Sequence, residues 1–488
     1  MDGWAYAGGA LRYEHCLKPG EPARPVPDAY LLIPNLMSTV AQPSELAAPG
    51  DDRTGVSGAV LHLASTQGEV RHPGAEARAL RADAFSRLLD ARLPQLTRDF
   101  AAGAAALDRE ARFPFENFAQ LQRHGLIAAV IPQAHGGHGA GLAEARRIIG
   151  AVAAGESATA LVLTMTYLQH RSLVRTSTRW PDAQRNDVFR SAVTGGALIN
   201  ALRVEPDLGT PARGGLPSTI ARRTETGWRL SGRKLYCTGI PALSWLSVWA
   251  RTDEAEPRVG VFLVPRPAGF QDGEGVLDRP GIRVVPNWDH LGLRASGSHE
   301  VILEDIDLPF GNAVDIRPLH EWAPAGIGQR DNDAHIEQQA WMSVLLGTLY
   351  DAVARAGTEW LVTFLNTRVP GNLGAPLASV PRVQETVGEI ATLLHVNQRL
   401  LDAAAAAADV GQPDDDIASG ALKFTVTGNA IRVLELALQL TGNHGLSRNN
   451  PLERHHRDVL CSRIHTPQND TILSAAGRRA LAAFRVHA

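Results

Sequence analysis

The hydrophobic positions change their spacing three times along the chain. Between residues 77 and 197, apolar side chains recur three or four positions apart, as at Phe85, Leu88 and Leu89. This spacing places them on one face of a helix. Glycines at positions 136, 137, 139 and 141 interrupt the pattern and indicate a loop between helices. We therefore expect an N-terminal α-helical domain over residues 77–197.

Residues 198–310 have the character of strands. The run from Arg258 to Val264 is short, apolar and β-branched, as expected for a strand buried on both faces. Further on, Val301 and Leu303 alternate with Glu300 and Glu304, which is typical of a half-buried strand. This region predicts a middle β domain, 198–310.

Helical spacing returns after the β region. Trp341, Leu345 and Leu349 share one helix face, and the set Ile431, Leu434 and Leu438 shares another. Residues 311–488 are therefore predicted to form a C-terminal helical bundle. Residues 1–76 show no sustained period and are rich in Gly, Pro, Ala and Ser, which predicts an irregular N-terminal extension.

The fold class expected from this order is α+β and mainly α, with strands between two helical regions. No alternation of strand and helix runs through the chain, which excludes simple Rossmann and TIM-barrel folds.

Composition narrows the function classes. The 488 residues carry 48 Lys+Arg and 51 Asp+Glu, so the formal charge is −3. This balance disfavours nucleic-acid and polybasic membrane binders. No apolar run reaches the roughly 18 residues that span a bilayer, and the first residues do not resemble a signal peptide. Three separated cysteines argue against a disulfide framework, and no motif has metal-ligand spacing. We expect a cytoplasmic protein that binds neither metal, membrane nor nucleic acid.

Four motifs lie in and around the β region. They are residues 200–210, with Glu205-Pro206 and Thr210; residues 232–239, with Tyr236 and Thr238; residues 288–298, with Arg294 and Ser296; and residues 304–309. Taken singly, each is a common turn or hairpin sequence. Their order and spacing together resemble the acyl-CoA dehydrogenase superfamily of flavoproteins over about residues 80–485. The resemblance implies an N-terminal helical domain, a β-barrel-like middle domain and a C-terminal four-helix bundle.

The resemblance also assigns flavin contacts. Thr210 takes the place of the serine in the family's Glu-Pro-x-x-Gly-Ser loop, and Thr238 that of the threonine that hydrogen-bonds near flavin N5. Tyr236 replaces the tryptophan of that strand. Arg294 and Ser296 belong to a Gly-x-Arg-x-Ser segment in the vicinity of the flavin or substrate. The expected cofactor is FAD.

Three further positions match elements that reach across a subunit interface in the family. Arg368 corresponds to an arginine at the cofactor pyrophosphate, which suits a planar guanidinium. Gln439 and Gly442 correspond to a turn on the adenine side, although Asn443-His444 replaces part of its glycine pattern. The resemblance thus implies a homodimer or homotetramer.

The catalytic base is a separate question. Family members need a carboxylate that removes the α-proton of an acyl thioester. Most carry it in a Tyr-Glu-Gly-Thr loop, but His465 and Thr466 occupy the tyrosine and glutamate positions here. A minority place the glutamate in the first turn of a helix after the β domain, and Glu337 falls on that position, with Gly347 ten residues later. A glutamate in a first turn also complements the helix dipole, so the base remains a hypothesis.

These residues favour an acyl-CoA or acyl-carrier-protein dehydrogenase that passes electrons to an electron-transfer flavoprotein. The alternative is a flavin-dependent monooxygenase of the same fold, which uses FMN reduced by a flavin reductase, together with O2. His465-Thr466-Pro467 is similar to a His-Asp-Pro turn in such enzymes. A non-catalytic scaffold is a third possibility, against which the retained flavin positions argue.

Overall fold

The computed structural model describes residues 73–175, 178–207, 215–266, 280–322 and 333–485. Contacts divide the chain into Met1–Val70 and Arg71–Ala488, and everything below concerns the second unit. The predicted extension 1–76 lies almost wholly outside the described residues, as does Thr210.

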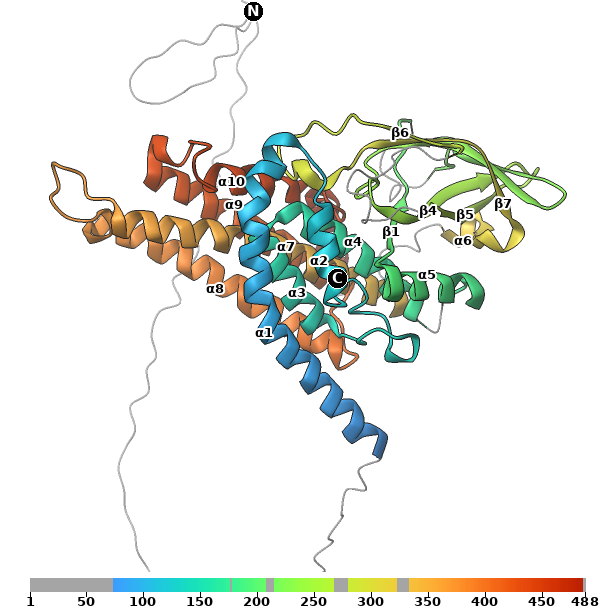
Figure 1. The fold of residues 1–488 in the computed structure, drawn as a ribbon, viewed down its shortest axis with the longest axis horizontal. Helices are drawn as coiled ribbons and strands as arrows, with labels where there is room; N and C mark the ends of the chain where they lie inside the picture. The colour runs from blue at the N-terminus through green and yellow to red at the C-terminus, as the bar shows by residue number, and fades with distance from the viewer. Residues whose placement is uncertain (1–72, 176–177, 208–214, 267–279, 323–332, 486–488) are drawn as a thin grey trace, which may run out of the picture. The chain divides into compact units, whose positions relative to one another are not determined.

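The described residues form a mainly helical structure with one sheet, as the fold class predicted (Figure 1). The helices before the sheet are α1 (Pro73–Glu110), α2 (Phe115–Arg123), α3 (Leu142–Gly155), α4 (Ser157–Val174) and α5 (Asp182–Gly195). Those after it are α6 (Leu319–Trp322), α7 (Asp333–Thr367), α8 (Pro381–Asp409), α9 (Asp416–Thr441), α10 (Leu452–Leu460) and α11 (Asn469–Arg485).

The strands are β1 (Leu198–Leu202), β2 (Ile220–Arg223), β3 (Gly227–Lys234), β4 (Leu243–Thr252), β5 (Arg258–Pro265), β6 (Ile282–Val285), β7 (Glu300–Pro309) and β8 (Ala313–Pro318). Their order is β6-β7-β3-β2-β4-β5-β8, and β1 pairs in parallel with the first half of β4. The described strands therefore run to Pro318, beyond the predicted boundary at residue 310.

A bundle of helices follows the sheet. Helix α7 packs against α8, α9 and α10, and α9 also contacts α11. Trp341, Leu345 and Leu349 of α7 are buried in its core, as their helical spacing predicted. Because α7 also packs on α3 and α4, the bundle and the N-terminal helices share one hydrophobic core.

Helix α4 connects the helical core to the sheet. Its N-cap is Glu156, whose carboxylate accepts hydrogen bonds from the backbone N–H groups of Ala158 and Thr159. Farther along, the hydroxyl of Thr166 donates to the carbonyl of Ile199 in β1. Helix α4 thus packs against β1 of the sheet on one side and against α7 on another.

None of the helices among the described residues is long and apolar enough to cross a membrane.

Candidate active site

A chain of hydroxyl groups lies beside the turn that follows β3. The Ser298 hydroxyl donates to Thr238 Oγ1 at 2.9 Å, and the fully buried Ser296 hydroxyl lies 2.7 Å from that of Ser298. The Thr238 carbonyl accepts a hydrogen bond from Asn200 Nδ2 at 3.0 Å. Two of the predicted residues, Thr238 and Ser296, are therefore brought together.

This hydroxyl chain fits a flavin as ligand. Because Thr238 Oγ1 accepts from Ser298, the Thr238 proton remains available to a ligand acceptor such as a flavin ring nitrogen or carbonyl. Gly239 closes the turn at φ 84°, and a Cβ there would lie 2.8 Å from a methyl group of Val162 in α4. The glycine thus permits the turn to pack closely on α4.

Tyr236 lies at the outer side of the same turn. Its backbone has a left-handed φ of 55°, and its side chain is exposed. The ring meets Trp288 and His290 edge-on at 6.4 and 6.1 Å, while those two rings stack at 3.6 Å. The turn therefore presents an exposed aromatic surface next to Thr238.

Glu337 lies near the start of α7 and faces α4 rather than open solvent. Its carboxylate oxygen Oε1 lies 2.5 Å from Arg171 Nη2 and 2.6 Å from Arg171 Nε, and Oε2 lies 3.2 Å from Arg175 Nε. The Glu337 side chain is 23% exposed. The guanidinium of Arg171 also lies over the ring of Trp341, 5.0 Å from its centre, which fixes its orientation.

Helix α4 contacts both parts of this candidate site. Val162 packs on Gly239, next to Thr238, and Arg171 pairs with Glu337. Nine residues separate Val162 from Arg171, which is about 14 Å along the helix. No hydrogen bond or ion pair among the described residues joins Glu337 directly to the hydroxyl chain.

His465 is half-buried in the loop before α11. Its Nδ1 lies 2.6 Å from the hydroxyl of Tyr350, which is fully buried on α7. Burial, assisted by the charge of Lys423, lowers the pKa of His465 to about 4, so the imidazole is neutral at pH 7. Thr466, the next residue, is exposed.

Lys423 shapes that loop and was not anticipated from the sequence. Its ammonium group is fully buried and donates to the carbonyls of Ser462, His465 and Pro467 at 3.1, 2.7 and 2.7 Å. Burial lowers its pKa to about 8. The sequence signal that could have found it is a lysine among the mainly apolar core positions of α9, because a buried charge must have partners.

The residues expected at a subunit interface are all on the surface. Arg368 is exposed just after α7, and its carbonyl accepts from the backbone N–H of Leu377 at 3.0 Å. Gln439 and Gly442 are exposed at the end of α9, and Gly442 has φ 53°. All three residues are therefore accessible from outside the chain.

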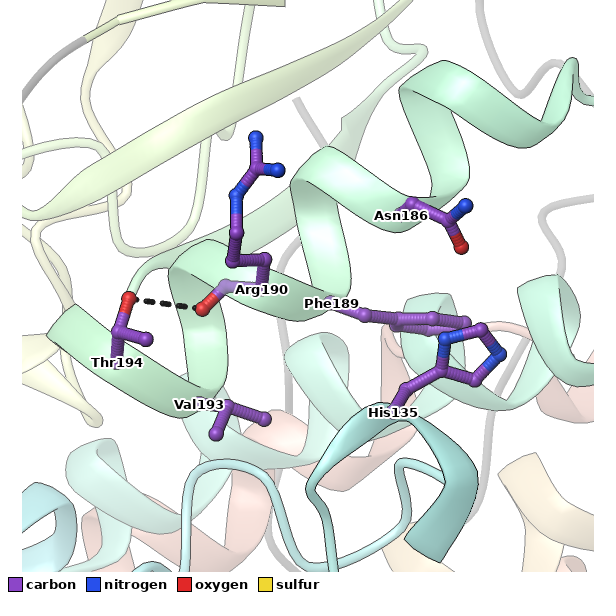
Figure 2. A pocket seen from close by; sticks show the side chains of 6 residues that line it. All are labelled: His135, Asn186, Phe189, Arg190, Val193 and Thr194. Atoms are coloured by element: carbon purple, nitrogen blue, oxygen red, sulfur yellow. Dashed lines mark hydrogen bonds between the residues drawn. The ribbon is translucent and has the colours of Figure 1, made fainter.

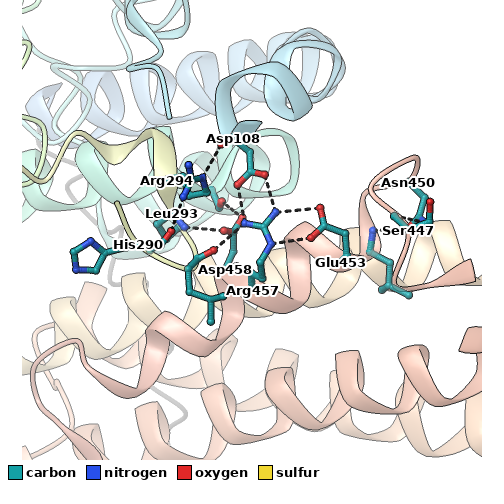
Figure 3. A network of polar contacts seen from close by, with 12 residues as sticks. Asp108, His290, Leu293, Arg294, Ser447, Asn450, Glu453, Arg457 and Asp458 are labelled. Carbon is teal, nitrogen blue, oxygen red and sulfur yellow. Dashed lines mark hydrogen bonds and ion pairs between the residues drawn. The ribbon is translucent and has the colours of Figure 1, made fainter. Parts of the chain in front are cut away.

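Arg294 bonds to neighbouring loops and to α1. Its Nε donates to the carbonyl of Asp108 in α1, and its Nη1 donates to Asp289 and to the carbonyl of His290 (Figure 3). The Arg294 guanidinium therefore ties the loop before β7 to α1.

The neighbouring Arg457-Asp458 pair joins the same regions. Arg457 pairs with Asp108 at 2.6 Å and Glu453 at 2.7 Å (Figure 3). Asp458 accepts from the Ser157 hydroxyl at 2.6 Å and from the Leu293 backbone at 2.7 Å. Burial raises the pKa of Asp458 to about 6, although both hydrogen bonds oppose that shift.

The approach at this junction is close enough to require a glycine. A Cβ at Gly292 would lie 2.4 Å from the carbonyl oxygen of Arg457. The Gly-Leu-Arg-x-Ser segment and the Arg-Asp pair, which lie far apart in the sequence, thus meet at one packed contact.

A buried ion pair supports the loop that follows β1. Lys234 Nζ lies 2.6 Å from Glu205 Oε1, and both side chains are completely buried. Glu205 also accepts from the backbone N–H groups of Ser218 and Thr219 at 2.5 and 3.1 Å. Glu205 of the Glu-Pro motif therefore fixes the loop through these bonds, a role that the sequence motif alone did not indicate.

Two of the cavities among the described residues lie away from the hydroxyl chain. One, of about 270 Å³, is lined by residues of α5 and by His135 (Figure 2). The other is a groove of about 1150 Å³ lined by parts of α1, α7 and α10 and by the loop that carries His290, Leu291 and Arg294. The described residues contain no group of three or more His, Cys, Asp or Glu side chains arranged to hold a metal ion.

Comparison with known proteins identifies the family. The model of the acyl-CoA dehydrogenase N-terminal domain matches residues 88–189, and that of the C-terminal domain matches residues 346–481. YdbM of Bacillus subtilis, assigned to the acyl-CoA dehydrogenases, is 29% identical over 387 residues, covering 78% of this chain and 93% of that protein. The mitochondrial short-chain specific acyl-CoA dehydrogenase of Bos taurus is 26% identical, covering 76% of this chain and 85% of that protein.

Solved structures agree on the fold. KijD3, in complex with FMN and an amino-keto sugar nucleotide, has a TM-score of 0.68 and 26% identity, covering 81% of this chain and 93% of its own. Butyryl-CoA dehydrogenase of Megasphaera elsdenii has a TM-score of 0.67 at 20% identity, covering 81% of this chain and 98% of its own. The chain belongs to the acyl-CoA dehydrogenase superfamily, and the comparisons support a flavin-dependent oxidoreductase.

Proposed function

We propose that this protein is an FAD-dependent dehydrogenase that introduces an α,β-double bond into an acyl group carried by coenzyme A or a carrier protein. The observation that carries the proposal is the half-buried carboxylate of Glu337, directed toward α4 at the start of the bundle. Similarity to acyl-CoA dehydrogenases over most of the chain supports the same reaction class.

In this proposal each residue has a defined role. Glu337 accepts the proton from the α-carbon as that C–H bond breaks, and the double bond forms as hydrogen leaves the β-carbon with its electron pair. Bound FAD supplies the acceptor for that hydride. Thr238 would donate a hydrogen bond from its hydroxyl to the cofactor, and Ser296 and Ser298 hold Thr238 in position.

The accessible residues suggest a shared site. We assign Arg368 to the cofactor pyrophosphate, and Gln439 and Gly442 to its adenine side, in a partner subunit of a homodimer or homotetramer. Thr210 would complete the flavin loop. An electron-transfer flavoprotein in the cytoplasm is the proposed acceptor of the electrons.

A second candidate is a two-component monooxygenase that receives reduced flavin from a reductase and uses O2. Two observations favour it: Glu337 is held by two arginines, and position 466 offers an exposed threonine instead of a carboxylate. The similarity to KijD3, which was solved with FMN, also supports it. In this case His465, neutral and held by Tyr350, would orient substrate or flavin through Nε2.

One pair of experiments separates the candidates. Oxidised protein is mixed without oxygen with a panel of acyl thioesters, and bleaching of the flavin near 450 nm is followed; in parallel, reduced flavin and oxygen are supplied and a C4a-hydroperoxide absorbance is sought. Dehydrogenation predicts bleaching that Glu337→Gln abolishes while flavin stays bound. Glu321→Gln, at a carboxylate that also pairs with an arginine, is the matched control. Unchanged bleaching in Glu337→Gln removes this residue from the mechanism.

A further inference from the structure

The hydroxyl chain beside Thr238 has a fixed direction. Ser298 donates its only hydroxyl proton to Thr238 Oγ1, so the 2.7 Å contact between Ser298 and Ser296 uses the Ser296 proton. Donation therefore runs from Ser296 to Ser298 to Thr238, and the Thr238 proton is left for a ligand. Since each hydrogen bond in a chain polarises the next, the position of Ser296 affects the donor that Thr238 offers.

Ser296 is positioned by a short turn in the loop before β7. The turn begins at Leu293 and ends at Gly297, and both have left-handed backbones, with φ 51° and 54°. Within it the Ser296 N–H donates to the Leu293 carbonyl at 3.0 Å, and the Ser296 carbonyl accepts from the Gly239 N–H at 2.9 Å. A left-handed leucine is costly and persists only where its surroundings hold it. The contacts of Leu293 therefore determine where Ser296 lies.

Helix α10 supplies those contacts. Arg457 Nη1 donates to the Leu291 carbonyl at 2.8 Å, and a Cβ at Gly292 would lie 2.4 Å from the Arg457 carbonyl oxygen. The next residue, Leu293, donates its backbone N–H to Asp458 Oδ1 at 2.7 Å. Leu293 and Asp458 are each 2% exposed, so water has little access to this bond. The hydrogen bond from Leu293 to Asp458 therefore fixes the first residue of the turn.

The second carboxylate oxygen of Asp458 binds the helix that packs on the Thr238 turn. Asp458 Oδ2 accepts the hydroxyl of Ser157, the first residue of α4, at 2.6 Å. Five residues farther along α4, which is about 7.5 Å, Val162 packs against Gly239. One buried carboxylate thus connects both the loop before β7 and the helix that packs on this turn.

We propose that Asp458 is a positioning residue that directs the Thr238 hydroxyl toward the cofactor. The proposal rests on the flavin assignment within the proposed function, and it holds for either candidate reaction because Thr238 has the same partner in both. Asp458 acts through Leu293, Ser296 and Ser298 rather than by touching the cofactor. Its removal should therefore cost the protein the hydrogen bond that Thr238 makes to flavin.

The test is a double-mutant cycle on FAD affinity. The full chain is freed of flavin and titrated with FAD, and the dissociation constant is obtained from the change in flavin fluorescence. Thr238→Val removes the hydroxyl and should weaken FAD binding about 3- to 10-fold, as expected for one net hydrogen bond. Asp458→Ala should have a similar effect in the parent but change the affinity by less than about 2-fold in Thr238→Val, because the group through which it acts is already gone.

Two milder variants keep the test decisive if Asp458→Ala does not fold. Asp458→Asn retains an acceptor for the Leu293 N–H, and its amide can donate to the Ser157 oxygen, so FAD affinity should stay within about 2-fold of the parent. A loss in Asp458→Asn as large as that in Thr238→Val overturns the proposal. Ser157→Ala deletes one partner of the carboxylate; it should weaken FAD binding about 2- to 3-fold in the parent and leave it unchanged in Thr238→Val.

The matched control is Asp351→Ala. Asp351 is also a buried carboxylate, but it binds Arg355 and Asn397 within the helical bundle. Its removal should lower thermal stability, while Thr238→Val keeps its full effect on FAD affinity in that background.

The outcomes distinguish this inference from the proposed reaction. Equal effects of Asp458→Ala with and without the Thr238 hydroxyl show a general structural role and overturn the proposal, as does an unchanged FAD affinity in Thr238→Val. Coupling between the two residues without bleaching by any thioester supports the positioning role and overturns the dehydrogenase reaction. Bleaching by a thioester together with independent effects of the two residues supports the reaction and overturns the positioning role.

Discussion

The buried pair between Lys234 and Glu205 gives the sharpest test of how the loop proposed to bind flavin is supported. Glu205→Gln retains the shape of the side chain but removes the charge, and its single carbonyl oxygen can accept from only one of the backbone N–H groups of Ser218 and Thr219. The ammonium of Lys234 then remains completely buried, with the carbonyl of Trp249 as its other acceptor. Burial lowers the pKa of Lys234, and Glu205 is the main group that opposes this shift.

Leaving one charge of a buried pair without its partner lowers the free energy of unfolding by about 3–5 kcal/mol. For the roughly 420 residues of Arg71–Ala488, the average unfolding entropy converts this cost to a decrease in Tm of about 3–6 °C. Thermal unfolding followed by circular dichroism measures the change. Because Glu205 lies at the start of the segment that leads to Thr210, retention of flavin should fall as well.

A double-mutant cycle makes the reasoning refutable. Lys234→Met combined with Glu205→Gln removes both charges, so the double variant should be more stable than the sum of the single losses implies. Glu389→Gln, which breaks an exposed pair with Arg432, is the matched control and should change stability by less than about 1 kcal/mol. If Glu205→Gln costs no more than this control, the pair does not support the fold.

Three further outcomes are expected. His170 is fully buried, and burial lowers its pKa to about 3, so its contribution to stability is complete above pH 6.5 and is lost as pH falls toward 3. Between pH 7 and pH 5, the free energy of unfolding measured by urea titration should therefore fall by about 2 kcal/mol less in His170→Leu than in the parent protein. The same pH dependence in both proteins would contradict this. Lys423→Met should expose the loop at residues 462–467 to amide exchange, because three carbonyls lose their donor; unchanged exchange would refute that role. Arg368→Ala should lower FAD occupancy but change Tm little, since the side chain is exposed; full occupancy would contradict the assignment.

Elements with a regular pattern were predictable from the sequence. The β-branched run beginning at Arg258 forms β5, and Val301 and Leu303 are buried in β7 as their alternation required. Glu300 departs from that alternation because Arg233 and Asn287 hydrogen-bond its carboxylate in a buried position. A period-two pattern reports where side chains point but cannot show which polar groups find partners.

The site was less predictable than the fold because its contacts join distant residues. The resemblance to the family led to Thr238 and Ser296, which the structure brings together through Ser298. It could not show that Arg171, 166 residues before Glu337, binds that carboxylate. Lys423 was missed for the same reason, since its acceptors are backbone carbonyls, which no side-chain motif encodes.

The junction at Asp458 has a consequence for how the loop before β7 moves. Its carboxylate joins α4 and the loop before β7 through two short hydrogen bonds, while Gly292 leaves no room between that loop and α10. Since separating the sheet from the bundle would break these bonds in a place without water, we expect the two to move as a single body there. Asp458→Ala would remove both hydrogen bonds, so we expect the loop before β7 to move more freely against α4 and α10 in that variant.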